Sequence, residues 1–128
     1  MSRPQARTSH VLSPELRAAR TCYDHLAGRL GMAVTDALSK DGSLTPEGAR
    51  RLEALGLDLR RLRGGRRVFL RPCLDWTERR PHIAGALGAA IAARLFELGW
   101  LERTDATRAV RLTDDGAEGL RQSFALRP

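Results

Sequence analysis

Two short stretches of the sequence carry the same set of chemically reactive side chains. Each has a cysteine, an aspartate and a histidine, namely Cys22, Asp24 and His25 in CYDHLAGRLG and Cys73, Asp75 and His82 in CLDWTERRPHIAGALG. Thiolate and imidazole groups are ligands of tetrahedral zinc, and neighbouring carboxylates hold such imidazoles in place. If the two stretches meet in the fold, they bring two thiols and two imidazoles to one ion.

The sequence therefore predicts a metal site. The predicted ligands are Cys22, His25, Cys73 and His82, with Asp24 and Asp75 orienting the imidazoles. Soft thiolate donors favour zinc or a similar ion, so zinc is the candidate cofactor.

Two other interpretations of the same residues stay open, because their spacing is not one of the standard zinc signatures. In one, Cys22 and Cys73 form a redox-sensing thiol pair. In the other, cysteine and histidine pack as core residues. The second interpretation predicts backbone bonds for the two aspartates, or pairing with Arg20 and Arg79, and places Trp76 in the seam between two repeats.

Catalysis has little support in the residue pattern. The sequence contains no nucleophile elbow, phosphate-binding loop or paired-carboxylate arrangement. A cysteine and a histidine three apart, as in Cys22 and His25, are weak evidence for a thiol enzyme. We therefore expect a binding protein and not an enzyme.

The spacing of apolar residues predicts elements that are mostly helical. Helices are expected at about 13–39, 45–56, 82–98 and from 113 onward, with a short strand at 68–71 and a hairpin over 100–113. The first helix would place Cys22 and His25 on one side, because they are three residues apart.

An internal repeat connects the two reactive stretches. A shift of 57 residues aligns His25 with His82, Gly28 with Gly85, and Gly31 with Gly88. Paired glycines three apart lie on one side of a helix and allow close approach, so we expect the two repeat helices to cross there.

These patterns predict a mainly α fold class, a pseudo-twofold helical repeat whose second half is a degenerate winged helix with one β-hairpin. Residues 1–13 are expected to form a flexible leader, and residues 14–128 a single domain of two repeats, about 14–62 and 68–128. A length of 128 residues suits one domain.

The chain is strongly basic, with a net charge of +7, and Lys40 is its one lysine among 22 basic side chains. A basic surface attracts phosphate or acidic partners. The candidate nucleic-acid contacts are Arg66 and Arg67 in the interior loop and Arg103, Arg108 and Arg111 on the hairpin. A solvated basic surface with no partner is the alternative.

The longest apolar run, residues 83–101, is interrupted by Arg94 and Glu97. It predicts a buried helix and not a membrane span. Without a recognisable signal peptide, we expect a cytoplasmic protein that does not partner with a membrane.

The stretch from about Arg20 to Phe124 resembles the C-terminal domain of ArsR-type (winged helix-turn-helix) bacterial transcriptional regulators. The resemblance is carried by ARTCYDHLAG at 19–28, LTPEG at 44–48 and RPCLDWTERRPH at 71–82. It implies a sensing or dimerisation module, acting as a homodimer with DNA or with a DNA-binding partner domain. The DNA-reading domain of such regulators lies outside these residues, so we expect a fragment or a stand-alone relative. The alternative function is a stand-alone metal- or thiol-redox-responsive binding protein.

Overall fold

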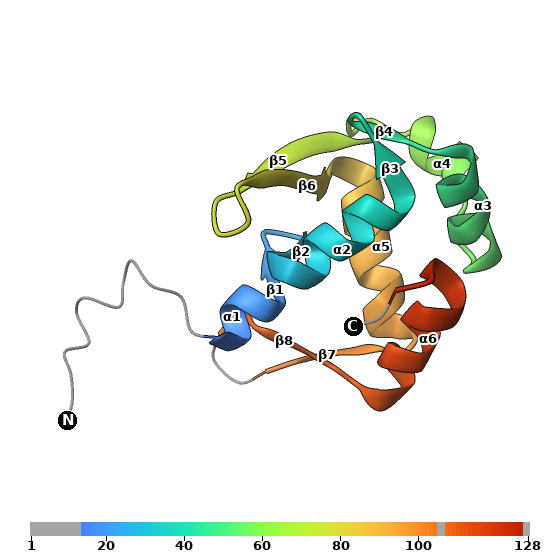
Figure 1. Ribbon diagram of the computed structural model, residues 1–128. Helices are drawn as coiled ribbons and strands as arrows, with labels where there is room; N and C mark the ends of the chain where they lie inside the picture. Colours follow the sequence, from blue (N-terminus) through green and yellow to red (C-terminus); the bar gives the residue numbers. More distant parts are fainter. Residues whose placement is uncertain (1–13, 105–106, 127–128) are drawn as a thin grey trace, which may run out of the picture.

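The computed structural model describes residues 14–104 and 107–126 (Figure 1). Its helices are α1 (Pro14–Ala18), α2 (Gly28–Leu38), α3 (Pro46–Ala54), α4 (Leu59–Arg63), α5 (Gly85–Glu97) and α6 (Asp114–Phe124). Its strands are β1 (Arg20–Cys22), β2 (His25–Ala27), β3 (Ser39–Lys40), β4 (Ser43–Leu44), β5 (Arg71–Asp75), β6 (Arg80–Ala84), β7 (Leu101–Arg103) and β8 (Val110–Leu112). The predicted leader, residues 1–13, lies outside the described residues.

The strands pair as four separate antiparallel hairpins, β1–β2, β3–β4, β5–β6 and β7–β8. About 49% of the structure is helical and 24% is strand. The predicted fold class is therefore wrong, because the chain is not a mainly α helical repeat with a single hairpin. It is a mixed fold in which each of four helices, α2, α3, α5 and α6, follows directly on a hairpin.

At two of these strand-to-helix junctions, a glycine allows the chain to turn sharply. Gly28 and Gly85, the first residues of α2 and α5, have φ angles of 80° and 79°. Side-chain-bearing residues rarely adopt this left-handed region. A Cβ atom on Gly28 would also lie 2.7 Å from the Arg17 carbonyl oxygen, and one on Gly85 would lie 2.7 Å from that of Val68.

The predicted helix over 13–39 is interrupted by hairpin β1–β2. Cys22 pairs with His25 across a two-residue turn in which Tyr23 has a φ of 58°. A two-residue turn also places residues three apart on one face, so the spacing of Cys22 and His25 fits a hairpin as well as a helix. The helical interpretation was wrong because the two patterns coincide over this short segment.

The second reactive stretch differs from prediction in a similar way. His82 lies in β6 instead of opening a helix. The strand predicted at 68–71 is wrong in all but its last residue, because β5 begins at Arg71 and runs through Pro72 to Asp75. Pro72 pairs with Ile83. Both strands of a two-stranded hairpin are edge strands, which is where proline is tolerated.

The prediction that the two repeat helices cross at their paired glycines is wrong. A Cβ on Gly31 would meet the carbonyl oxygen of Leu26 at 2.7 Å, and one on Gly88 would meet that of Ile83 at 2.6 Å. In both cases the nearest neighbour is the strand just before the helix, and a Cβ on Gly88 would also lie 3.1 Å from the Cβ of His25 in β2. The close approach therefore folds each helix against its own hairpin.

Several predicted elements are confirmed. The hairpin over 100–113 is present as β7–β8, and the helix predicted after Thr45 is α3. Thr45 and Thr113 cap α3 and α6 by accepting hydrogen bonds from the N–H groups of Gly48 and Gly116, each at 2.9 Å.

Figure 1 shows α2 and α5 in the middle of the molecule, with hairpins β1–β2 and β5–β6 toward one side and α3, α4 and α6 toward the other. The core includes Leu38, Leu52, Leu87, Leu95 and Phe124, all fully buried. The predicted burial of the segment after His82 is confirmed, since α5 contributes Leu87, Ile91 and Leu95 to this core. Among the described residues, no helix combines the length and hydrophobicity needed to cross a membrane.

Candidate metal centre

Each of the hairpins β1–β2 and β5–β6 carries one cysteine opposite one histidine. Cys22 is the cross-strand partner of His25, and Cys73 is the cross-strand partner of His82. Directly opposed residues project from the same face of a hairpin. Each hairpin therefore presents one thiol and one imidazole side by side.

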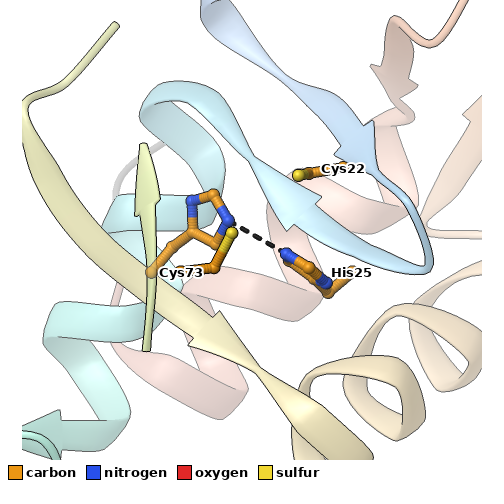
Figure 2. A group of neighbouring side chains, drawn as sticks. Cys22, His25 and Cys73 are labelled. Atoms are coloured by element: carbon orange, nitrogen blue, oxygen red, sulfur yellow. Dashed lines mark hydrogen bonds between the residues drawn. The ribbon is translucent and has the colours of Figure 1, made fainter. Parts of the chain in front are cut away.

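The two hairpins bring all four side chains together. The sulfur atoms of Cys22 and Cys73 and a ring nitrogen from each of His25 and His82 all lie within 4.8 Å of one another. In Figure 2 the labelled side chains of Cys22, His25 and Cys73 point toward a common centre. Ligand atoms around a tetrahedral zinc are about 3.3–3.8 Å apart, given the usual zinc–nitrogen and zinc–sulfur bond lengths. The observed spacing is close to this requirement.

The two imidazoles face each other through the same ring atom. Their Nε2 atoms are 3.0 Å apart, and their ring planes are tilted by 52°. Each Nδ1 atom faces a carboxylate, since His25 Nδ1 is 3.3 Å from Asp24 Oδ1 and His82 Nδ1 is 3.1 Å from Asp75 Oδ2.

These contacts determine which nitrogen carries the proton. A carboxylate accepts hydrogen bonds, so both aspartates favour the tautomer with the proton on Nδ1, and in that tautomer each Nε2 keeps a lone pair. Two lone pairs 3.0 Å apart repel unless a proton or a cation lies between them. Burial lowers the pKa of both His25 and His82 below the ordinary histidine value, which disfavours the extra proton.

Burial divides the four side chains into two pairs. His25 and His82 are 3% and 2% exposed, whereas Cys22 and Cys73 are partly exposed. Burial and the neighbouring Cys22 raise the pKa of the Cys73 thiol. A bound cation reverses this effect, because metal coordination favours the thiolate.

Asp75 connects the centre to the rest of the core. It is fully buried, and its Oδ1 accepts hydrogen bonds from Arg20, from Thr77 and from the Glu78 N–H. Its Oδ2 accepts from the Gly28 N–H at 2.6 Å as well as facing His82. Burial alone raises the pKa of Asp75, but these donors together hold it well below its usual range. Asp75 therefore stays ionised while it orients His82.

Asp24 supports His25 from the surface. Its Oδ2 accepts a hydrogen bond from Arg67 at 2.8 Å, and its side chain is 30% exposed. Burial raises the pKa of Asp24, but the hydrogen bonds from Arg67 and His25 outweigh this and lower it. The carboxylate is therefore ionised beside His25.

The structure assembles all four predicted ligands and places both predicted carboxylates on the imidazoles. The structural interpretation predicted backbone bonds for the aspartates or a pairing with Arg20, and Asp75 makes both. Two details were not predicted: that the helix-starting N–H of Gly28 is one of the donors, and that Thr77 is another. The sequence Asp-Trp-Thr signals the second, because aspartate commonly accepts from the N–H two residues later. Trp76 is 57% exposed, so its predicted place in a buried seam is wrong.

The predicted nucleic-acid contacts do not form one patch of free cations. Arg67 pairs with Asp24, Arg111 pairs with Glu102, and Arg103 stacks on Phe96 with 4.4 Å to the ring centre. The Arg108 carbonyl accepts from the Thr21 N–H at 2.9 Å, which joins β1 to the β7–β8 hairpin. Within residues 14–104 and 107–126, Arg66 is exposed and has no hydrogen bond or ion pair.

Comparison with known proteins gives one similar curated protein. The chain is 45% identical over 111 residues to the "Uncharacterized HTH-type transcriptional regulator YdfF" of Bacillus subtilis (strain 168), a match that covers 80% of this chain and 49% of that protein. The chain thus spans about half the length of the curated relative it matches. No family model matches the chain, and no solved structure matches it.

Proposed function

We propose that this chain is the sensing module of a transcriptional regulator and that it binds one zinc ion through Cys22, His25, Cys73 and His82. The regulatory role is supported by the 45% identity to a protein named as an HTH-type transcriptional regulator. The binding role is supported by the four ligand atoms within 4.8 Å. Such a regulator acts on the chromosome, so its place is the cytoplasm of a bacterium.

The observation that carries the metal proposal is the pair of opposed Nε2 atoms. Both Nδ1 atoms face carboxylates, and both Nε2 lone pairs converge where the two thiols also lie. A divalent cation removes the repulsion between the lone pairs and favours the thiolates. Without a metal, one Nε2 has to carry a proton to bridge the pair, and burial of both imidazoles disfavours the extra charge.

The ArsR-like character, DNA contact and dimer formation are further parts of the proposal. Dimeric regulators of the helix-turn-helix type bind paired half-sites. Among the described residues, the Arg66 and Arg108 side chains are the exposed members of the predicted nucleic-acid set without a hydrogen bond or ion pair, and Arg103, Arg108 and Arg111 belong to the segment around β7–β8. Phosphate contact at these residues gives binding that weakens steeply with salt.

The first test is metal content, measured by elemental mass spectrometry on protein purified without chelator or affinity metal. We expect about one zinc per chain, from one four-ligand site. The Cys22→Ser, Cys73→Ser double variant should contain none. The His82→Gln variant removes one of the proposed ligands. His10→Gln changes the third histidine of the chain and is its matched control.

A spectroscopic measurement identifies the ligands directly. Cobalt(II) added to the chelator-treated wild type should give the absorption bands of a tetrahedral ion and a sulfur-to-metal charge-transfer band. Both should disappear in the double cysteine variant, and circular dichroism verifies that the variant is folded. Wild-type protein that takes up neither zinc nor cobalt would contradict the proposal.

A further inference from the structure

The two thiols of the centre differ from the two imidazoles in their access to solvent. Both imidazoles are buried, whereas Cys22 and Cys73 are partly exposed and free. They are the two cysteines of the whole chain, and their sulfur atoms belong to the cluster within 4.8 Å. A small oxidant from solvent therefore reaches the sulfur side of the centre before the nitrogen side.

We propose that Cys22 and Cys73 are a site of reversible oxidation by a hydroperoxide, and that the intramolecular disulfide they form releases the metal. The disulfide depends on the geometry of the two thiols alone. The metal release rests on the proposed function. Together they make the regulator responsive to peroxide as well as to metal.

The chemistry balances with one peroxide for each pair of thiols. The thiolate of one cysteine attacks a peroxide oxygen, the O–O bond breaks, the sulfur is oxidised to a sulfenic acid, and hydroxide leaves and takes up a proton as water. The second thiol then attacks the sulfenic sulfur. The S–S bond forms, the S–O bond breaks, and the departing hydroxide takes the thiol proton and leaves as a second water.

The local structure permits the sulfur atoms to meet. A disulfide requires about 2.05 Å between sulfurs, so the two atoms must move by no more than about 3 Å from their present separation. Cys22 ends the three-residue strand β1, and the next residue, Tyr23, is 86% exposed. The Tyr23 side chain therefore offers no packing that would resist a small shift of Cys22.

Oxidation removes half of the donor set. A disulfide sulfur is no longer a thiolate, so His25 and His82 remain as the two ligands, too few to hold zinc against a chelator. Conversely, bound zinc occupies both thiolates and protects them from the peroxide. The metal-free protein should therefore oxidise faster than the zinc-loaded protein.

The test treats chelator-stripped, reduced protein and zinc-loaded protein with hydrogen peroxide. In the stripped protein we expect the two free thiols per chain to fall to none, with an intact mass lower by two hydrogens, a monomer on a non-reducing gel and full recovery with dithiothreitol. In the loaded protein, zinc captured by a coloured chelator should appear in step with thiol loss. Cys73→Ser cannot form the intramolecular bond and is the control.

A second variant separates this inference from the proposed function. His82→Gln keeps both cysteines but loses a ligand, so zinc should no longer slow its oxidation. If the wild type binds no zinc, the stripped protein still decides whether the disulfide forms. Recovery of sulfinic acid or of disulfide-linked dimers in place of the intramolecular bond would overturn the inference, whatever the metal content.

Discussion

Hairpins β1–β2 and β5–β6 present the same cysteine–histidine pair but support it in different ways. In β5–β6 the imidazole is held by a fully buried carboxylate, Asp75, which is paired with Arg20 at 3.1 Å. In β1–β2 it is held by Asp24, which is 30% exposed and pairs with Arg67 at 2.8 Å. One hairpin is therefore supported from the core and the other from the surface.

The helices that follow the two hairpins also differ in the acceptors to which their first N–H groups donate. The first N–H of α2 donates to Asp75, a residue of β5. At the start of α5, Ala86 and Leu87 donate to the carbonyls of Val68 and Phe69. Asp75 thus connects the second hairpin to the helix of the first, and Asp24 has no equivalent contact among the described residues. Cross-strand register therefore places the cysteine and histidine of each hairpin, and we expect stability to depend mainly on Asp75.

The largest expected effect is that of Asp75→Asn on the free energy of unfolding. An asparagine replaces one acceptor oxygen with an NH2 group, which then faces donors whichever way it is turned, and it leaves the Arg20 guanidinium in the core without a carboxylate partner. Breaking one partner of a buried pair costs about 3–5 kcal/mol. Urea unfolding of metal-free, reduced protein measures the loss.

Asp24→Asn is the matched variant in the other hairpin. Its pair with Arg67 is partly exposed, and such pairs contribute about 0–1 kcal/mol. Equal losses for the two variants would show that the two hairpins do not differ in the way proposed.

The next largest expected effect concerns a feature that the two hairpins share, the glycine that begins the helix after each of them. Gly28→Ala and Gly85→Ala should each destabilise the protein by about 2–4 kcal/mol, because each forces a side chain into the left-handed region and against a carbonyl. Gly99→Ala is the control, since Gly99 has a φ of 76° but nothing within 4 Å of the added Cβ. It should lose only about 1–2 kcal/mol. A loss at Gly99 as large as at Gly85 would mean that backbone conformation alone, without crowding, determines the cost.

The sequence predicted which reactive side chains come together better than it predicted the elements that carry them. The two cysteines, two aspartates and two histidines could be grouped because thiol, carboxylate and imidazole recur in the same order in both stretches. Helix α3, helix α6 and hairpin β7–β8 could be identified because their threonine caps and strand alternation are local signals.

Hairpin β1–β2 was not predicted because its sequence signal is ambiguous. Cys22 and His25 are three apart, a spacing that suits one face of a helix and also suits a two-residue hairpin turn. The turn places Tyr23 at a φ of 58°, a left-handed conformation that a tyrosine in the sequence does not predict. The contact of Asp75 with Gly28 joins residues 47 apart, and no local pattern encodes such a pair.

A smaller effect concerns zinc affinity. Asp24→Asn should weaken zinc binding about tenfold, because the carboxylate that orients a ligand histidine typically contributes this much. Competition with a coloured chelator measures the affinity. Asp36→Asn is the matched control, because Asp36 also forms an exposed pair with an arginine, Arg80, but does not contact either histidine. A similar loss in both variants would point to a general charge effect and not to the orientation of His25.

Arg67→Ala should have the smallest effect, below about 0.5 kcal/mol in stability and about threefold in zinc affinity. Arg67 is 47% exposed, and Asp24 keeps its own contact with His25 at 3.3 Å when the arginine is removed. Unfolding and chelator competition on the same preparation measure both quantities. If Arg67→Ala instead weakens zinc binding as much as Asp24→Asn does, then the arginine holds the carboxylate in place. The surface support of β1–β2 would then act as an arginine–aspartate–histidine chain, and the two hairpins would differ in burial alone.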